Sequence, residues 1–498
     1  MLRAHAGFCM VFSSFAFLWL FLPPALVVYY VAARVSTRAA NWALALLGYA
    51  FYAWSIPKFL VLMWATTVID WTLGLVIAGN SPLFWRSHGK DLGELPEKQP
   101  RSTLQRRAVA LSVVLNLCSL GFFKYAGFAD EAVRDLAALL GARLADHPTL
   151  QVALPLGISF YTFQSLSYII DVYRGEARAM TRFGDFACFV SMFPHLVAGP
   201  ILRFAFLAKQ LEKREITRDK LARGVALFCV GMGKKVLLAN TAGALSDVCF
   251  GAHGISLTQA WAGAFAYAMQ VYFDFSGYSD MAVGLGLMLG FVFARNFDSP
   301  YRADSLTDFW RRWHISLSSW LRDYLYIPLG GSRMSSARTY FNLTVTMVLG
   351  GLWHGAAWTF VIWGAIHGLG LAIERAGAKT LLERLPRPAR QALVFFVVLN
   401  AWVFFRAESL SHALGYLSSM YGVSSPAPTA GLVSALAFTP LQLAGTVLGA
   451  AVVWLGKDAW QFTRTLTFGR AVALVSLMLV SVAMLSVQSY NPFIYFIF

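Results

Sequence analysis

The sequence predicts an all-α polytopic membrane protein. Of its 498 residues, 58% are hydrophobic and only 13% are charged, whereas roughly a quarter of the residues in a soluble domain carry a charge. Its apolar runs repeatedly reach the ~18–20 residues that a helix needs to cross a bilayer. Basic residues gather in the segments between these runs, as the positive-inside rule describes for cytoplasmic loops. We expect about ten to twelve transmembrane helices.

The predicted spans are the apolar runs themselves. In chain order they cover residues 10–33, 40–54, 56–79, 108–128, 150–171, 224–250, 258–292, 340–355, 356–373, 391–406, 431–455 and 471–488. No tandem repeat or linker divides the chain, so we expect residues 10–498 to form a single transmembrane domain. We expect residues 1–9 to be an extension, because MVFSSFAFLWLFLPP from Met10 reads as a more natural start than Met1.

The net charge of +16 would raise nucleic acid as a partner if the protein were soluble. Here the basic residues lie between spans, where topology selection and anionic lipid head groups explain them better. The segments 86–107, 203–223 and 374–390 should therefore be cytoplasmic, and the nearly balanced loop 130–149 should face outward. Two cytoplasmic segments require an even number of crossings between them. Residues 184–201 would add a third crossing, so we expect them to be re-entrant or interfacial.

The segment 302–338 should lie on the cytoplasmic side by the same count. Its Trp310, Trp313 and Trp320 recur at helical spacing with Arg311 and Arg312 between them. That pattern is typical of a helix that lies flat in the membrane interface.

Four ionisable residues interrupt the hydrophobic sequence between Gln270 and His367. They are Asp274, Asp280, His314 and His354. Such groups cost several kcal/mol at membrane depth unless they have a partner or a watery cavity, so they are functional candidates. For the aspartates, hydrogen bonding between helices is the plain alternative to lining a polar tunnel.

His354 lies in GGLWHGAAW, where glycines allow close approach and Trp353 and Trp358 supply walls. His314 lies in FWRRWHISLSSW. Neither has a histidine or carboxylate three or four residues later, as a helical zinc site would require. GYSDM lacks the last glycine of a serine-hydrolase elbow. General-base chemistry by imidazole remains, beside the alternatives of a helix–helix hydrogen bond or a hydrated interfacial histidine.

His367 follows His354 by 13 residues. On a continuous helix the two would lie about 20 Å apart and point in different directions. We therefore expect His367 to be structural and outside the site.

These runs resemble the membrane-bound O-acyltransferases, specifically the bacterial alginate O-acetyltransferase branch. The likeness extends through GISFYTFQSLSYIIDVYRG, MFPHLVAGPILRF and AWVFFRAES, and it is most specific between Phe273 and Gly331. It implies a helical shell around a central tunnel in the bacterial inner membrane. It also implies transfer of an acetyl group from a cytoplasmic thioester, acetyl-CoA or another acetyl thioester, to an exported polysaccharide that is alginate-like or cellulose. No bound cofactor or metal is implied, and periplasmic partner proteins are.

The family's catalytic histidine maps onto His354 and its second motif histidine onto His314. The residues expected to line the substrate and donor tunnel are Asp274, Tyr278, Asp280, Trp310, Arg311, Arg312, Trp313, Trp353 and Trp358. The arginines would meet donor phosphates, or else extend to lipid head groups. The alternatives are a transporter or export channel without catalysis, an acyltransferase acting on another envelope polymer, and a scaffold for a secretion complex. The sequence leaves the polymer, the donor, the immediate acceptor and the oligomeric state open.

Overall fold

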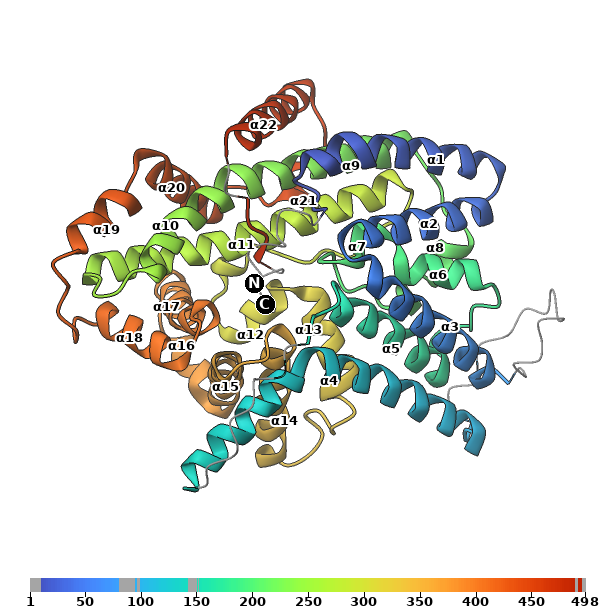
Figure 1. Cartoon of the computed structure of the whole chain (residues 1–498), viewed down its shortest axis with the longest axis horizontal. Coiled ribbons are helices and arrows are strands. Elements are labelled where there is room, and N and C mark those ends of the chain that lie inside the picture. The colour runs from blue at the N-terminus through green and yellow to red at the C-terminus, as the bar shows by residue number, and fades with distance from the viewer. Residues whose placement is uncertain are drawn as a thin grey trace. The chain divides into compact units, whose positions relative to one another are not determined.

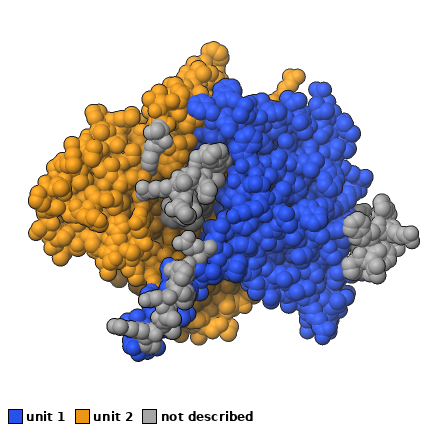
Figure 2. All heavy atoms as spheres, in the orientation of Figure 1, with its two compact units in different colours: residues 1–217, 289–291 blue, residues 218–288, 292–498 orange. Residues whose placement is uncertain are grey.

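The computed structural model describes residues 10–79, 95, 99–141, 150, 152–488 and 491–494, and these residues form helices and connecting segments without a strand. The predicted extension 1–9 and parts of the loops 86–107 and 130–149 lie outside the described residues. The chain divides into two compact units, residues 1–217 with 289–291 and residues 218–288 with 292–498 (Figure 2).

The first unit consists of α-helices with one π-helical segment (η2) and one 3₁₀ turn (η3) (Figure 1). In chain order these are η2 (Ala16–Phe21), α1 (Leu22–Val35), α2 (Thr37–Ser55), η3 (Pro57–Phe59), α3 (Leu60–Ile77), α4 (Thr103–Leu139), α5 (Ile158–Arg174), α6 (Phe183–Ser191), α7 (Phe193–Leu196) and α8 (Phe204–Glu212). Helix α4 begins at a capping box, in which Ser102 and Gln105 each bond to the other's backbone N–H. It runs into the predicted outward loop, where an Asp130–Arg134 ion pair one helical turn apart supports it.

The second unit contains the polar segments singled out in the sequence. Its elements are α9 (Arg218–Gly233), η4 (Lys234–Ala239), α10 (Asn240–Gly251), α11 (Leu257–Met288), η5 (Pro300–Arg302), α12 (Leu306–Arg312), α13 (Ile315–Leu321), η6 (Arg322–Tyr326), α14 (Ser336–His354), α15 (Trp358–Ile373), η7 (Glu374–Ala378), α16 (Lys379–Leu382), α17 (Arg387–Arg406), α18 (Leu410–Met420), α19 (Ala430–Ala437), α20 (Pro440–Leu455), α21 (Ala459–Phe462) and α22 (Phe468–Val487).

Helices α9 and α11 pack along a seam of glycines. A Cβ atom on Gly231 would lie 2.4 Å from the carbonyl oxygen of Gly277, and one on Gly284 would lie 2.5 Å from that of Gly224. Both distances are far inside van der Waals contact, so only glycine fits. Small residues that let backbones touch are the usual basis of helix association in membranes.

Five helices among the described residues are long and apolar enough to cross a membrane. They are Ala16–Val35, Pro57–Ile77, Thr103–Leu139, Arg387–Arg406 and Phe468–Val487. The pair α19 and α20 makes a sixth if a 66° bend belongs to one span. The expected ten to twelve spans therefore stay a prediction, while the all-helical, multi-span character is confirmed.

One local prediction is wrong. The segment 302–338 is not one flat helix, because α12 ends at Arg312 and His314 adopts a left-handed backbone (φ 43°, ψ 54°) before α13 begins. The outward placement of 130–149 stays a prediction; this connection is helical as far as Leu139, because its alanines, leucines and paired charges favour a helix.

Candidate active site

His354 lies at the tip of a helical hairpin. Helix α14 ends at His354 because Gly355 turns to extended backbone. Helix α15 starts at Trp358 and packs back along α14 (Figure 1). The two helices touch through glycines: a Cβ atom on Gly351 would lie 2.2 Å from the carbonyl oxygen of Phe360. Of the glycines predicted to admit a backbone or a ligand, Gly351 admits the backbone of α15, whereas a Cβ atom on Gly355 would meet the ring of Phe360.

His314 lies beside His354, with 6.2 Å between the ring centroids. It occupies the break between α12 and α13 with a positive φ, a conformation that costs a non-glycine residue about 1–3 kcal/mol and that clusters at functional sites. The side chain is fully buried. The structure brings together two histidines that are 40 positions apart in the chain.

Asn296 holds the strained turn in place. Its Oδ1 accepts hydrogen bonds from the backbone N–H of Ser316 (3.2 Å) and the Ser316 hydroxyl (2.9 Å), and its backbone carbonyl accepts from the N–H of Ile315 (2.9 Å). The same Oδ1 lies 3.2 Å from Nδ1 of His314. A backbone N–H can only donate, so this oxygen is an acceptor and Nδ1 of His314 carries the hydrogen.

That arrangement fixes the chemistry of the other ring nitrogen. With Nδ1 protonated, Nε2 of a neutral His314 holds a lone pair, and it has no hydrogen-bond partner within the described part of the chain. Burial, with a smaller contribution from the charge on His354, lowers the pKa of His314 well below its ordinary value. A neutral imidazole with a free, buried lone pair is suited to accept a proton or a hydrogen bond from a hydroxyl group.

Aromatic rings surround the two histidines. Trp353 lies 5.0 Å from the ring of His354 and 6.0 Å from that of His314, measured between centroids. Trp363 and Phe405 contact His354 at 5.4 and 5.3 Å. The imidazoles are thereby held in one orientation and shielded from solvent.

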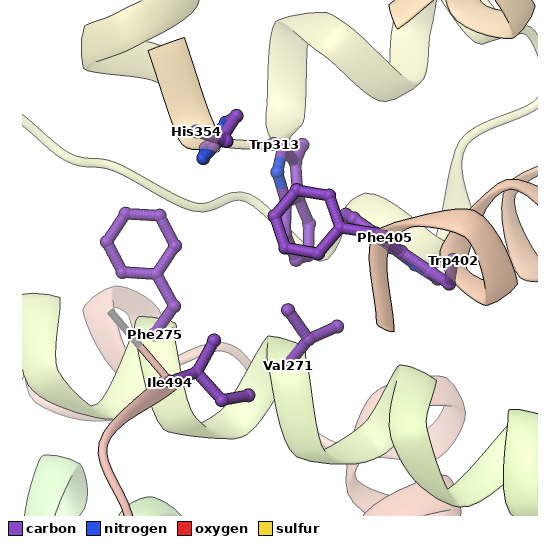
Figure 3. A pocket seen from close by; sticks show the side chains of 7 residues that line it. All are labelled: Val271, Phe275, Trp313, His354, Trp402, Phe405 and Ile494. Atoms are coloured by element: carbon purple, nitrogen blue, oxygen red, sulfur yellow. The ribbon is translucent and has the colours of Figure 1, made fainter. Parts of the chain in front are cut away.

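A narrow apolar cavity opens beside His354 (Figure 3). Its lining residues are Val271, Phe275, Trp313, His354, Trp402, Phe405 and Ile494. Val271 and Phe275 come from α11, and Trp402 and Phe405 from α17 (Figure 3). About 10 Å³ of the cavity is open to the centre of a water-sized molecule, which is about the space of one water. His354 supplies the only ionisable side chain among these lining residues.

The other predicted tunnel residues divide into two groups. Trp313 lines the cavity and Trp353 contacts both histidines. Trp358 is 45% exposed, and Arg312 is paired with Asp308 at 2.8 Å. Arg311 is exposed as well. These three side chains do not line the cavity.

The distance of about 20 Å predicted between His354 and His367 is wrong, while a structural role for His367 outside the site stays a prediction. The chain breaks after His354, so His367 lies on the returning helix α15, with its ring 5.0 Å from Trp363, which in turn contacts His354. Its Nδ1 lies 3.3 Å from the indole nitrogen of Trp310. The distance expected from a continuous helix does not apply to a hairpin, and His367 is one aromatic ring away from His354.

Asp274 and Asp280 are buried in ion pairs. Nζ of Lys235 lies 2.6 Å from Oδ1 of Asp274, and Nζ of Lys234 lies 2.6 Å from Oδ2 of Asp280. Tyr278 stacks on Phe493 with 4.5 Å between the centroids. We did not predict the two lysines, although they stand in the apolar run 224–250. The rule that selected the aspartates would also have selected them.

Asn296, Trp402, Phe405 and Ile494 were also missed. Amides and apolar residues near a site carry no signal of their own in a single sequence. Their roles come from tertiary contacts.

The protein belongs to the membrane-bound O-acyltransferase family: residues 176–410 match the model of that family. It is an O-acyltransferase and a multi-pass membrane protein. The chain is 47% identical over 412 residues to a probable alginate O-acetylase of Pseudomonas aeruginosa, covering 83% of this chain and 75% of that protein. It is 42% identical to a probable alginate O-acetylase of Azotobacter vinelandii, covering 98% and 100%. It is also 33% identical to a peptidoglycan O-acetyltransferase of Helicobacter pylori, covering 84% and 81%.

Proposed function

We propose that this protein transfers an acetyl group from a cytoplasmic thioester to an acceptor hydroxyl group. The acetyl group is destined for an exported polysaccharide, with alginate as the first candidate. The observation that carries the proposal is the pair of buried imidazoles, 6.2 Å apart between centroids, beside an apolar cavity. The alginate O-acetylases among the relatives support the choice of polymer.

In the proposed reaction His354 acts as the general base. It takes the proton of the acceptor hydroxyl as the oxygen attacks the thioester carbonyl, the new C–O bond forms and the C–S bond breaks. The proton then passes to the leaving thiolate, which departs as the thiol. The Nε2 lone pair of His314 accepts a hydrogen bond in the same space and orients the acceptor hydroxyl or the ring of His354.

The donor and the acceptor lie in different compartments in this proposal. The donor, most simply acetyl-CoA, approaches from the cytoplasmic side of the bacterial inner membrane along a tunnel that begins near the segment 310–320. Exposed Arg311 suits contact with its phosphates. Periplasmic partner proteins carry the acetyl group on to the polymer. The segment 184–201 is re-entrant or interfacial in this scheme, since α6 and α7 are only 9 and 4 residues long and a span needs ~20.

Replacing His354 tests the assignment. We expect His354→Ala to lower acetyl transfer by ~10²–10⁴-fold, the usual effect of losing a general base. Turnover would be measured with purified protein in detergent and labelled acetyl-CoA, and the polysaccharide of cells with and without the gene would be compared by mass spectrometry. His253→Ala, at an exposed histidine, is the control. Near-normal transfer by folded His354→Ala would reject His354 as the general base. Acetylation that does not depend on the gene would reject that polysaccharide as the destination of the acetyl group.

A further inference from the structure

The segment Asn491–Ile494 is built into the core of the second unit. Phe493 and Ile494 are both 4% exposed, and Ile494 is one of the residues that line the cavity beside His354. The wall of the candidate active site therefore includes a residue that follows α22. Residues 491–493, which lead to Ile494, have no regular secondary structure, so contacts with other elements must hold this backbone in place.

The buried ion pair between Lys235 and Asp274 holds this segment from both sides. Asp274 uses Oδ1 for the lysine and Oδ2 to accept the backbone N–H of Ile494 at 2.8 Å. Lys235 donates in turn to the carbonyl oxygen of Pro492. The two side chains are only 3% and 2% exposed. A hydrogen bond to a buried charge is stronger than one between neutral groups, so these contacts fix the backbone firmly.

Among the described residues, the neighbouring ion pair makes no hydrogen bond to segment 491–494. Lys234 and Asp280 stand on the same two elements, η4 and α11, at the same separation of 2.6 Å, and Lys234 also reaches Ser276. The two aspartates are six positions apart, about 9 Å along the axis of α11. If these buried pairs served only to join the two elements, both pairs would do so equally. Hydrogen bonds to segment 491–494, by contrast, are made by Asp274 and Lys235.

We propose that Asp274 and Lys235 are positioning residues that clamp segment 491–494 and so set the wall of the cavity at Ile494. The inference rests on the proposed function in one respect, since the test that measures turnover requires acetyl transfer. The clamp itself is a statement about the position of Ile494 and can be tested without any substrate.

The first test measures access to position 494. Ile494→Cys is made in a background with Cys9→Ser and Cys118→Ser, and its reaction with a small maleimide is followed in detergent. We expect Asp274→Asn to raise the labelling rate by ~10-fold or more, because hydrogen bonds to charged groups are among the stronger ones. Asp280→Asn, the matched control, leaves the rate unchanged. Equal effects of the two variants, or none, would overturn the clamp.

A second variant spares the ion pair. Ile494→Pro removes the N–H that Asp274 accepts without leaving a buried charge alone, so it remains informative if Asp274→Asn fails to fold. Ile494→Val keeps the N–H and is its control. We expect Ile494→Pro to lower kcat per folded molecule by ~10-fold or more, while Ile494→Val stays near wild type. Equal turnover of the two variants would reject the positioning role.

The two readouts separate the two proposals. Absence of acetyl transfer by the wild-type protein would count against the proposed function alone, and the labelling result would still decide the clamp.

Discussion

Replacing Asn296 by alanine should disable the site more than it destabilises the protein. The substitution removes the oxygen that accepts from Ser316 N–H, from the Ser316 hydroxyl and from Nδ1 of His314. At about 0.5–1.5 kcal/mol net for each of the three bonds, the loss is about 1.5–4.5 kcal/mol. That is comparable with the ~1–3 kcal/mol that the positive φ of His314 costs. Without Asn296 the turn can relax and carry the imidazole away from His354.

We expect kcat of Asn296→Ala to fall by ~10²-fold or more, since a displacement of about 1 Å in a catalytic arrangement costs that much. The assay is turnover per folded molecule, with thermal unfolding followed in parallel. Asn342→Ala is the matched control, because Asn342 is a fully buried amide that bonds to the carbonyls of Leu329 and Gly331, away from the cavity. It should lose similar stability and keep its turnover. A kcat within ~3-fold of wild type in folded Asn296→Ala would refute this reasoning.

Asn296→Asp gives the sharper signature. A carboxylate keeps every acceptor contact but adds a negative charge beside His314, which favours the protonated imidazole and raises its pKa above that in the native protein. A protonated ring has no lone pair, so on acidification the variant should lose activity at a higher pH than the native protein does. The pH–rate profile of kcat should shift to higher pH. An unshifted profile would show that the Nε2 lone pair of His314 takes no part in the reaction.

Two further predictions concern the fold. Gly351→Val should prevent the hairpin from closing, because even a Cβ atom there would lie 2.2 Å from the carbonyl oxygen of Phe360. Gly121→Val should be tolerated, because a Cβ atom on Gly121 would have no described atom beyond its own helix backbone within 4 Å. Equal yields of folded protein from the two variants would contradict this. Cysteines placed at Arg182 and Arg203 should react with an impermeant thiol reagent from the same side of the membrane, whereas labelling from opposite sides would show that the segment between them spans.

The sequence was informative where chemistry alone marks a residue. Ionisable groups in apolar runs stand out whatever the fold, which is why His314, His354, Asp274 and Asp280 could be chosen in advance. Aromatic neighbours such as Trp353 followed from adjacency in the chain. These predictions needed only the cost of burying charge and a short distance along the sequence.

Other features depend on tertiary structure, which one sequence does not display. Nothing in HGAAW states that the helix reverses there, so the distance from His354 to His367 was calculated for the wrong geometry. The left-handed backbone at His314 is stabilised by contacts with Asn296, which lies 18 positions earlier in the chain. The contacts of the aspartates and the position of Ile494 in the cavity wall also join residues that are far apart in the chain. Asp274 and Ile494 are separated by 220 positions.

The narrowness of the cavity has a consequence for the choice of acyl group. A space that accommodates about one water also accommodates one methyl group. In the proposed reaction the methyl end of an acetyl group fits against Phe405 and Val271 with little rearrangement, whereas each further methylene must displace a ring or the backbone at Ile494. Chain length would therefore be discriminated by volume before any bond is made or broken. In the proposed reaction the rigid aromatic walls would then select the donor by the size of its acyl group, independently of the chemistry of the thioester.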